Sequence, residues 1–141
     1  MTAPEDLRRE PRDLALVALY EADQRGLHPA EVGTGFPAKA ARLIGGVGNH
    51  LEELDKAIDG VSTRWRVARM PPVDRAILRL GLYELRFEIK TPMAVVVSEA
   101  VRLAKLYSTE RSGAFVNGIL AKLAVVERPG EAPHPGKPTG P

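Results

Sequence analysis

Basic residues form a stripe on one predicted helix, and their spacing suggests phosphate binding. Between residues 72 and 90, four cations and one aromatic ring fall within roughly 80° of a helical wheel: Arg75, Arg79, Tyr83, Arg86 and Lys90. Guanidinium and ammonium groups attract phosphates, and a tyrosine ring can stack on a nucleobase. The stripe therefore favours a nucleic-acid ligand, and an ordinary solvated helix face remains the alternative.

Acidic residues lie on roughly the opposite side of the same predicted helix. They are Asp74, Glu84 and Glu88. A strip of carboxylates suits docking to a basic protein partner, because complementary charges steer association. Ordinary solvation of a charged face explains the pattern equally well.

Further basic residues lie before and after this helix in the chain. Arg102 and Lys105 belong to the following predicted helix, and Arg111 stands in the loop before Phe115. A second group lies near the N-terminus: Arg8, Arg9 and Arg12. These segments would form an interrupted track for phosphates if the fold brings them together, which the sequence alone does not show.

The residue types that catalysis or metal binding requires do not cluster in this sequence. The three histidines are far apart and have no carboxylates at ligand-like spacing. The glycines at 45–48 lack the lysine of a phosphate-binding loop, and Ser98 and Ser108 have no suitably spaced histidine. We therefore expect no metal, no cofactor and no enzyme activity, and we interpret Trp65 as a core side chain. A small all-helical enzyme would need its charged groups inside the bundle, whereas here they lie off the apolar faces.

Composition indicates one globular domain with an uneven distribution of charge. The 141 residues include no cysteine, and no apolar run approaches the roughly 18–20 residues of a membrane span, so we expect a soluble cytoplasmic protein. The formal net charge is only +2. Residues 64–111 nevertheless contain ten basic and five acidic side chains, whereas the first half of the chain is acidic. This asymmetry favours one face that meets a polyanion.

Apolar periodicity predicts an all-α fold. We expect helices over residues 12–26, 38–61, 72–90 and 91–107, with an alternative break near residue 46 among the glycines and with Thr91 as an N-cap. A short connector that ends in two prolines spans residues 62–72. We expect one domain over residues 1–126, followed by a disordered Pro- and Gly-rich tail over 127–141.

The segment FVNGIL at residues 115–120 contains two conflicting signals. Asn-Gly between apolar pairs is a strong hairpin signal. However, the apolar residues around it fall within roughly 140° of a helical wheel, and an isolated hairpin is marginal in water. We therefore predict a helix, in which Asn117 and Gly118 would mark a contact that needs a small residue.

Three motifs in this order resemble the NusB family: VDRAILRLGLYEL at 73–85, SEAVRLAK at 98–105 and FVNGIL at 115–120. The run RDLALVALYEAD at 12–23 and the tryptophan–arginine connector before Pro71 are also similar to that family. The resemblance covers about residues 8–126. It implies an all-α fold of two packed helical subdomains, with about six to seven helices and with the N-terminal helix alongside a C-terminal bundle.

The resemblance also implies a function. Proteins of this family bind boxA RNA of ribosomal operons together with the ribosomal protein NusE, and the pair helps RNA polymerase to resist termination. That role requires affinity and geometry and no bond making.

The resemblance assigns residues to two surfaces. It implies phosphate contacts at Arg8, Arg9 and Arg12. It implies an RNA-facing side at Tyr20, Phe115 and Asn117. It implies a surface for the ribosomal protein at Asp74, Arg75 and Glu84. The acidic strip agrees with the third assignment and adds Glu88, whereas Arg75 belongs to the opposite stripe of the helical wheel.

This sequence departs from the family in its N-terminal segment, where four acidic residues dilute the three arginines and Pro11 shortens the first helix. We therefore expect weak binding of RNA by the chain alone and a modest salt dependence, with Arg102, Lys105 and Arg111 sharing the contacts. Two alternatives remain open: a related RNA-binding domain that serves rRNA modification or ribosome assembly, and a homodimer in which the RNA surface is buried.

Overall fold

The computed structural model describes residues 10–131, which are helical wherever they form regular structure. The α-helices, in chain order, are α1 (Pro11–Arg25), α2 (Ala38–Asn49), α3 (Leu51–Val61), α4 (Pro72–Phe87), α5 (Met93–Tyr107) and α6 (Glu110–Glu127). Two 3-10 turns, η1 (Pro29–Glu31) and η2 (Val67–Arg69), lie in the connections. The predicted all-α class is therefore confirmed. The segment 115–120 lies inside α6, which rules out the hairpin.

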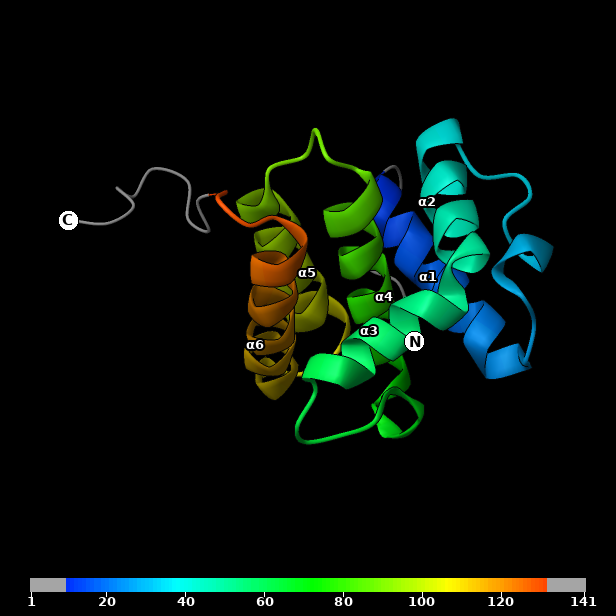
Figure 1. The fold of residues 1–141 in the computed structure, drawn as a ribbon. Coiled ribbons are helices and arrows are strands. Elements are labelled where there is room, and N and C mark those ends of the chain that lie inside the picture. Colours follow the sequence, from blue (N-terminus) through cyan, green and yellow to red (C-terminus); the bar gives the residue numbers. More distant parts are fainter. Residues whose placement is uncertain (1–9, 132–141) are drawn as a thin grey trace.

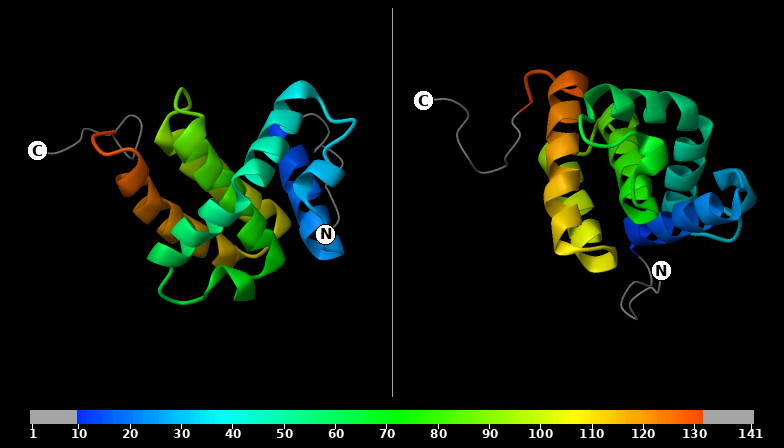
Figure 2. Two further views of the ribbon diagram at one scale, coloured as in Figure 1. Left: turned by 45° about the vertical axis from the view of Figure 1, so that its right-hand side comes forward. Right: turned by 90° about the horizontal axis from the view of Figure 1, so that it is seen from below.

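The helices form two packed groups. Helices α4, α5 and α6 lie against one another as a three-helix bundle (Figure 1). Helices α1 and α2 pack together beside α4, and α3 crosses α4 and α6 (Figure 2). The N-terminal helix therefore lies alongside the C-terminal bundle, as the family resemblance implies.

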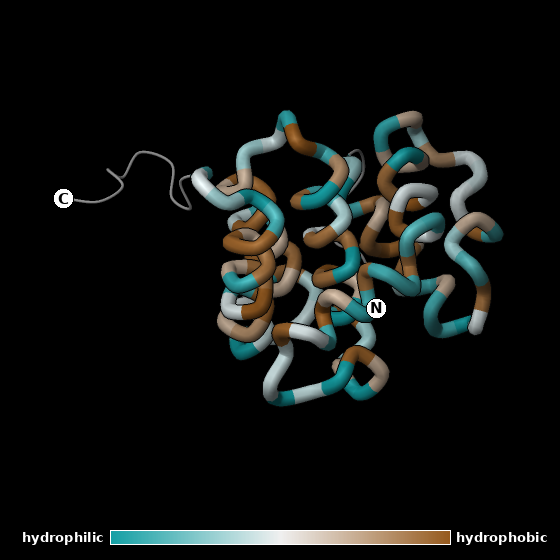
Figure 3. The backbone as a smooth tube through the Cα atoms, in the orientation of Figure 1, coloured by the Kyte–Doolittle hydropathy of each residue, from teal (hydrophilic) through white to brown (hydrophobic). Residues whose placement is uncertain are grey.

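Helix α4 is the centre of the molecule. Ten of its sixteen residues are buried, and hydrophobic residues recur along α4 and the helices around it (Figure 3). Leu78 and Leu82 are fully enclosed. A helix contacted on most sides must pair its charged groups with neighbours, because an unpaired buried charge is costly. No helix within residues 10–131 is long and apolar enough to cross a membrane.

The long helix predicted over residues 38–61 is divided in two. Helix α2 ends at Asn49 and α3 begins at Leu51, so the break lies near His50 and not near residue 46. The glycine at residue 46 has another role. A Cβ atom there would lie 2.3 Å from the ring of Tyr83, so the ring packs directly against the α2 backbone. The close approach that the glycines suggested is therefore made by a side chain.

Three local predictions need correction. Thr91 is not an N-cap, because α5 begins at Met93. The Met93 N–H donates to the carboxylate of Glu131, which lies after the end of α6.

The predicted tail begins too early, because Arg128 is buried and its side chain donates to four backbone carbonyls. Gly118 faces open space, so no contact requires a small residue there. The remainder of the predicted tail, residues 132–141, lies outside the described residues.

Candidate nucleic-acid interface

A pocket of about 710 Å³ opens between the connector before α4 and the corner where α5 meets α6. Both segments lie at the same end of the bundle (Figure 1). Its lining is mostly apolar and includes two aromatic rings, two arginines and a group of hydroxyls. We call it the aromatic pocket and define it by Arg64, Trp65, Asp74, Ser108, Thr109, Arg111, Ser112 and Phe115.

The walls of the aromatic pocket are formed by Trp65 and Phe115. Their ring centroids lie 5.4 Å apart in an edge-to-face arrangement, and Trp65 is 39% exposed. The prediction that Trp65 is a core side chain is therefore wrong. The connector holds the ring outward because Asp59 accepts the Val67 N–H and the Ser62 hydroxyl donates to the Trp65 carbonyl. An exposed, fixed indole is a platform on which an unpaired base can stack.

The rim of the aromatic pocket is cationic. The guanidinium of Arg64 lies 5.7 Å from the centre of the Trp65 ring, and Arg111 stands on the first turn of α6. Both side chains are exposed, and neither is ion-paired to another residue between 10 and 131. Cations beside stacking rings can bind the phosphates that accompany stacked bases.

The floor of the aromatic pocket is a fixed polar cluster. Asp74 on α4 is 2% exposed and accepts hydrogen bonds from the hydroxyls of Ser108 and Ser112, each 2.9 Å long. Thr109 caps α6 by accepting the Ser112 N–H at 3.1 Å. The cluster joins the start of α4 to the α5–α6 corner, so the pocket is bounded by segments that are held in place.

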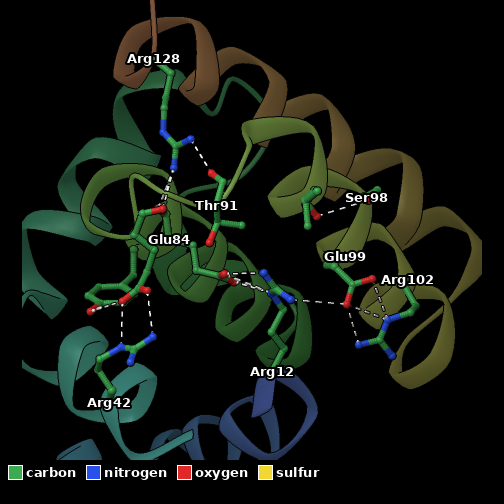
Figure 4. A network of polar contacts seen from close by, with 11 residues as sticks. Arg12, Arg42, Glu84, Thr91, Ser98, Glu99, Arg102 and Arg128 are labelled. Carbon is green, nitrogen blue, oxygen red and sulfur yellow. Dashed lines mark hydrogen bonds and ion pairs between the residues drawn. The ribbon is translucent and has the colours of Figure 1, made fainter. Parts of the chain in front are cut away.

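A second cluster joins the first turn of α1 to α4 and α5 (Figure 4). Arg12 donates to both carboxylate oxygens of Glu84, at 2.9 Å from Nε and 2.8 Å from Nη2. Its Nη1 lies 3.7 Å from Oε1 of Glu99. Arg102 binds both oxygens of Asp13, at 2.6 and 3.2 Å. The predicted phosphate ligands Arg12 and Arg102 are therefore brought together, and each is already paired with a carboxylate.

Burial and pairing act in opposite directions on this cluster. Burial raises the pKa of Glu84, although the hydrogen bonds and charge of Arg12 oppose the shift. The hydrogen bonds that Arg102 donates to Asp13 raise the pKa of Arg102, against the opposing effect of burial. Tyr107 at the end of α5 also donates to Asp13 at 2.9 Å. Since Tyr107 immediately precedes the pocket residue Ser108, this ion-paired cluster is continuous in the chain with the aromatic pocket.

The basic stripe on α4 is neutralised within the molecule. Arg75 pairs with Asp23, Arg79 with Asp55 and Arg86 with Glu127. The ring of Tyr83 is buried, and its hydroxyl donates to Glu88. These four residues are therefore part of the packing between helices and do not form an open track for phosphates, whereas Lys90, the fifth member of the stripe, lies beyond the end of α4 and is exposed.

The four residues predicted for a protein partner are also engaged within the chain. Asp74 and Glu84 are buried, so the acidic strip is not an exposed surface. Arg75 donates to three backbone carbonyls of the connector in addition to Asp23. Glu88 is half-buried and pairs with Arg42 of α2. A role for any of these four residues in partner binding stays a prediction.

The other predicted RNA ligands occupy different settings. Lys105 on α5 and Asn117 on α6 are exposed, and Tyr20 is half-buried on α1, away from the aromatic pocket. Arg8 and Arg9 lie outside the described residues.

Sequence reasoning missed the two pocket residues of the connector, Arg64 and Trp65. The sequence contained a usable signal of exposure. The indole lies next to arginines in a short segment before two prolines, and its neighbours in the chain are not apolar.

A helical body with an open aromatic pocket and a cationic rim is typical of proteins that bind unpaired nucleic acid by stacking and phosphate contact. Comparison with known proteins identifies the family of this chain. Residues 9–125 match the NusB family. The transcription antitermination protein NusB of Acidothermus cellulolyticus is 42% identical over 140 residues, which span 93% of this chain and 97% of its own.

Solved structures give the same result. NusB of T. maritima has a TM-score of 0.73 at 35% identity, covering 88% of this chain and 92% of its own. A structure of the antitermination factors NusB and NusE in complex with double-stranded RNA has a TM-score of 0.72 at 30% identity, covering 87% and 99%. The chain belongs to the NusB family.

Proposed function

We propose that this chain is a transcription antitermination factor. It binds boxA-type RNA of ribosomal operons together with the ribosomal protein NusE, and the complex helps RNA polymerase to resist termination. The full-length similarity to antitermination proteins supports this function, as does the similarity to a structure in which NusB, NusE and RNA occur together. The role calls for affinity and geometry, and we assign no catalytic step to the chain.

The aromatic pocket is the observation that carries the RNA-binding part of this proposal. Its walls expose stacking surfaces, and its rim supplies cations that are not neutralised by neighbouring carboxylates. Single-stranded RNA is recognised by this combination, because unpaired bases are free to leave the strand and stack on aromatic rings. We therefore assign base contacts to Trp65 and Phe115 and phosphate contacts to Arg64 and Arg111.

The remaining predicted ligands extend this surface. Arg12 and Arg102 would contribute phosphate contacts through the sides of their guanidiniums that face Glu99. The exposed side chains of Lys105 and Asn117 would contact the strand next to the pocket. Arg8, Arg9 and Tyr20 keep the roles that the family resemblance implies.

A second function uses the same RNA surface in rRNA modification or ribosome assembly. The same pocket would serve that role, so the two functions differ in their partners and not in their RNA contacts. Dependence of RNA binding on NusE favours antitermination, whereas equal binding with and without NusE favours the second function.

Fluorescence anisotropy with a labelled boxA-type single strand tests the proposal. We expect saturable binding by the full chain that becomes tighter when NusE is added, and a scrambled strand of equal length and charge serves as the control. The proposal is wrong if neither the chain alone nor the chain with NusE prefers the boxA strand over the scrambled strand.

A further inference from the structure

Two arginines from different helices converge on one partly exposed carboxylate (Figure 4). Glu99 lies on the second turn of α5. Its Oε1 is 3.7 Å from Nη1 of Arg12 on α1, and its Oε2 is 3.2 Å from Nε of Arg102, one turn further along α5. The carboxylate is therefore the only anionic group shared by these two guanidiniums within residues 10–131.

The three carboxylates of this cluster are not equivalent. The side chains of Glu84 and Asp13 are only 5% and 3% exposed, and each binds its arginine through two oxygens from the inner side. Glu99 is 26% exposed and lies on the outer side. Displacing Glu84 or Asp13 would leave a buried charge without a partner, which is costly. Glu99 can turn into solvent without that penalty.

The inner carboxylates also hold the two guanidiniums ready for an external anion. Arg102 is fixed by two hydrogen bonds to Asp13, which is held in turn by the Tyr107 hydroxyl. Arg12 is fixed by its bonds to Glu84. Donors that are already in position lose little conformational freedom when they bind a ligand. A phosphate diester oxygen has the same charge and acceptor character as the Glu99 carboxylate.

We propose that the space between Arg12 and Arg102 is a binding site for one backbone phosphate of the RNA, and that Glu99 occupies it in the free protein. This inference rests on the proposed function. RNA binding exchanges the Glu99 carboxylate for the phosphate, while Glu84 and Asp13 keep their partners. Glu99 therefore weakens RNA binding in the wild-type chain and favours strands that place a phosphate at this site.

Replacing Glu99→Gln tests the exchange, because the amide keeps the size of the side chain and removes its charge. We expect RNA affinity at low salt to rise about fivefold, the factor that corresponds to an ion pair of partly exposed groups. Glu21→Gln is the matched control, because it makes the same change of charge. Glu21 is an exposed α1 residue that pairs with Arg25. The control should alter affinity by less than about twofold, because its charge is screened from the site.

The double variant Glu99→Gln/Arg102→Gln separates the local site from a general effect of charge. We expect the gain from Glu99→Gln to disappear when Arg102 is absent, because coupled residues do not contribute additively. Thermal melts followed by circular dichroism confirm that each variant is folded. In the wild-type chain, the Arg102 Nε–H NMR resonance should also shift when RNA is added.

The outcomes distinguish this inference from the proposed function. If the wild-type chain binds RNA and Glu99→Gln binds no more tightly than Glu21→Gln, the phosphate site is wrong and the function stands. An unchanged Arg102 resonance at saturating RNA has the same meaning. If no variant binds RNA, even with NusE present, both proposals are wrong.

Discussion

Trp65 and Phe87 show how differently two aromatic residues of equal exposure can be placed. Each is 39% exposed. Trp65 forms a wall of the aromatic pocket beside Arg64, whereas Phe87 stacks on the ring of His50 at the other end of α4. The two residues match in exposure and differ in position. Substituting each in turn therefore distinguishes base stacking in the pocket from a general loss of aromatic surface.

Replacing Trp65→Ala should lower RNA affinity about tenfold, because stacking of a base on an aromatic ring contributes about 1–3 kcal/mol. Anisotropy titration with a boxA-type strand measures the loss, and Phe87→Ala is the control that should leave affinity within about twofold if stacking is confined to the pocket. Equal losses for the two variants would place the binding surface elsewhere.

A substitution of Glu84 would not weaken a partner surface selectively, because it would also destabilise the fold. Glu84 is buried and holds Arg12, and the cost of removing one member of a buried pair is set by the charge left behind. We expect Glu84→Ala to lower the free energy of unfolding by about 3–5 kcal/mol. Urea denaturation measures this change.

Glu88→Ala is the control for that experiment. Glu88 pairs with Arg42, whose side chain is 55% exposed, and accepts the hydroxyl of the buried Tyr83, so the loss should be about 1–2 kcal/mol. A cost for Glu84→Ala as small as that for Glu88→Ala would mean that the Arg12–Glu84 pair does not anchor α1.

At the scale of elements, apolar periodicity predicted most helices well. The helices α1, α4 and α5 follow the predicted segments closely, because their apolar faces repeat every three or four residues, whereas α6 begins at Glu110 and includes Arg111, which was predicted to lie in a loop. The break between α2 and α3 was misplaced, since the glycines that suggested it accommodate Tyr83. That packing joins residues 37 positions apart in the chain, so it cannot be predicted from local composition.

Arg128, directly after α6, binds backbone carbonyls at both ends of the connection between α4 and α5. Arg128 donates to the carbonyls of Glu84, Leu85 and Glu88 at the end of α4 and to that of Thr91 in the loop. Carbonyls in a last helical turn lack partners inside the helix, so a buried guanidinium can satisfy several at once. The proline- and glycine-rich composition predicted a tail here. The partners of Arg128 lie far upstream in the sequence, so local composition does not reveal them.

Arg128→Ala should therefore destabilise the fold by about 2–4 kcal/mol, since hydrogen bonds to charged groups contribute about 1.5–3 kcal/mol and the carbonyls would lose their donor. Thermal and urea unfolding measure the loss. Lys122→Ala, at an exposed position on α6, should cost less than about 0.5 kcal/mol. Similar effects of the two substitutions would show that the segment after α6 does not hold the α4–α5 connection.

For the molecule as a whole, charge distribution was the least predictable property. The basic excess over residues 64–111 suggested a wide cationic face, yet five of its ten cations are paired with carboxylates: Arg66, Arg75, Arg79, Arg86 and Arg102. Their partners come from α1, α3 and α6, and a helical wheel of one segment does not include them. Of the other five, Arg64 and Arg111 line the aromatic pocket, whereas Arg69, Lys90 and Lys105 are exposed outside its lining.

This distribution predicts a modest salt dependence of RNA binding. Arg64, Arg111 and the site between Arg12 and Arg102 provide about three phosphate contacts, and Lys105, Arg8 and Arg9 bring the total to about six. Each contact contributes about −0.7 to the slope of log affinity against log salt for a single strand, so we expect a slope of about −2 to −4. Anisotropy titrations between low and physiological salt measure it, and a slope steeper than about −5 would require many more contacts than this surface offers.

Trp65 is the only tryptophan in the chain, so its fluorescence reports directly on the aromatic pocket. Titration of the wild-type protein with an unlabelled boxA-type strand, in the presence of NusE lacking tryptophan, is the most direct test of the central claim. We predict saturable quenching of Trp65 emission with the same midpoint as the anisotropy titration, because a base stacks on the indole. Full binding by anisotropy with unchanged Trp65 emission would contradict the assignment of the aromatic pocket as the RNA site.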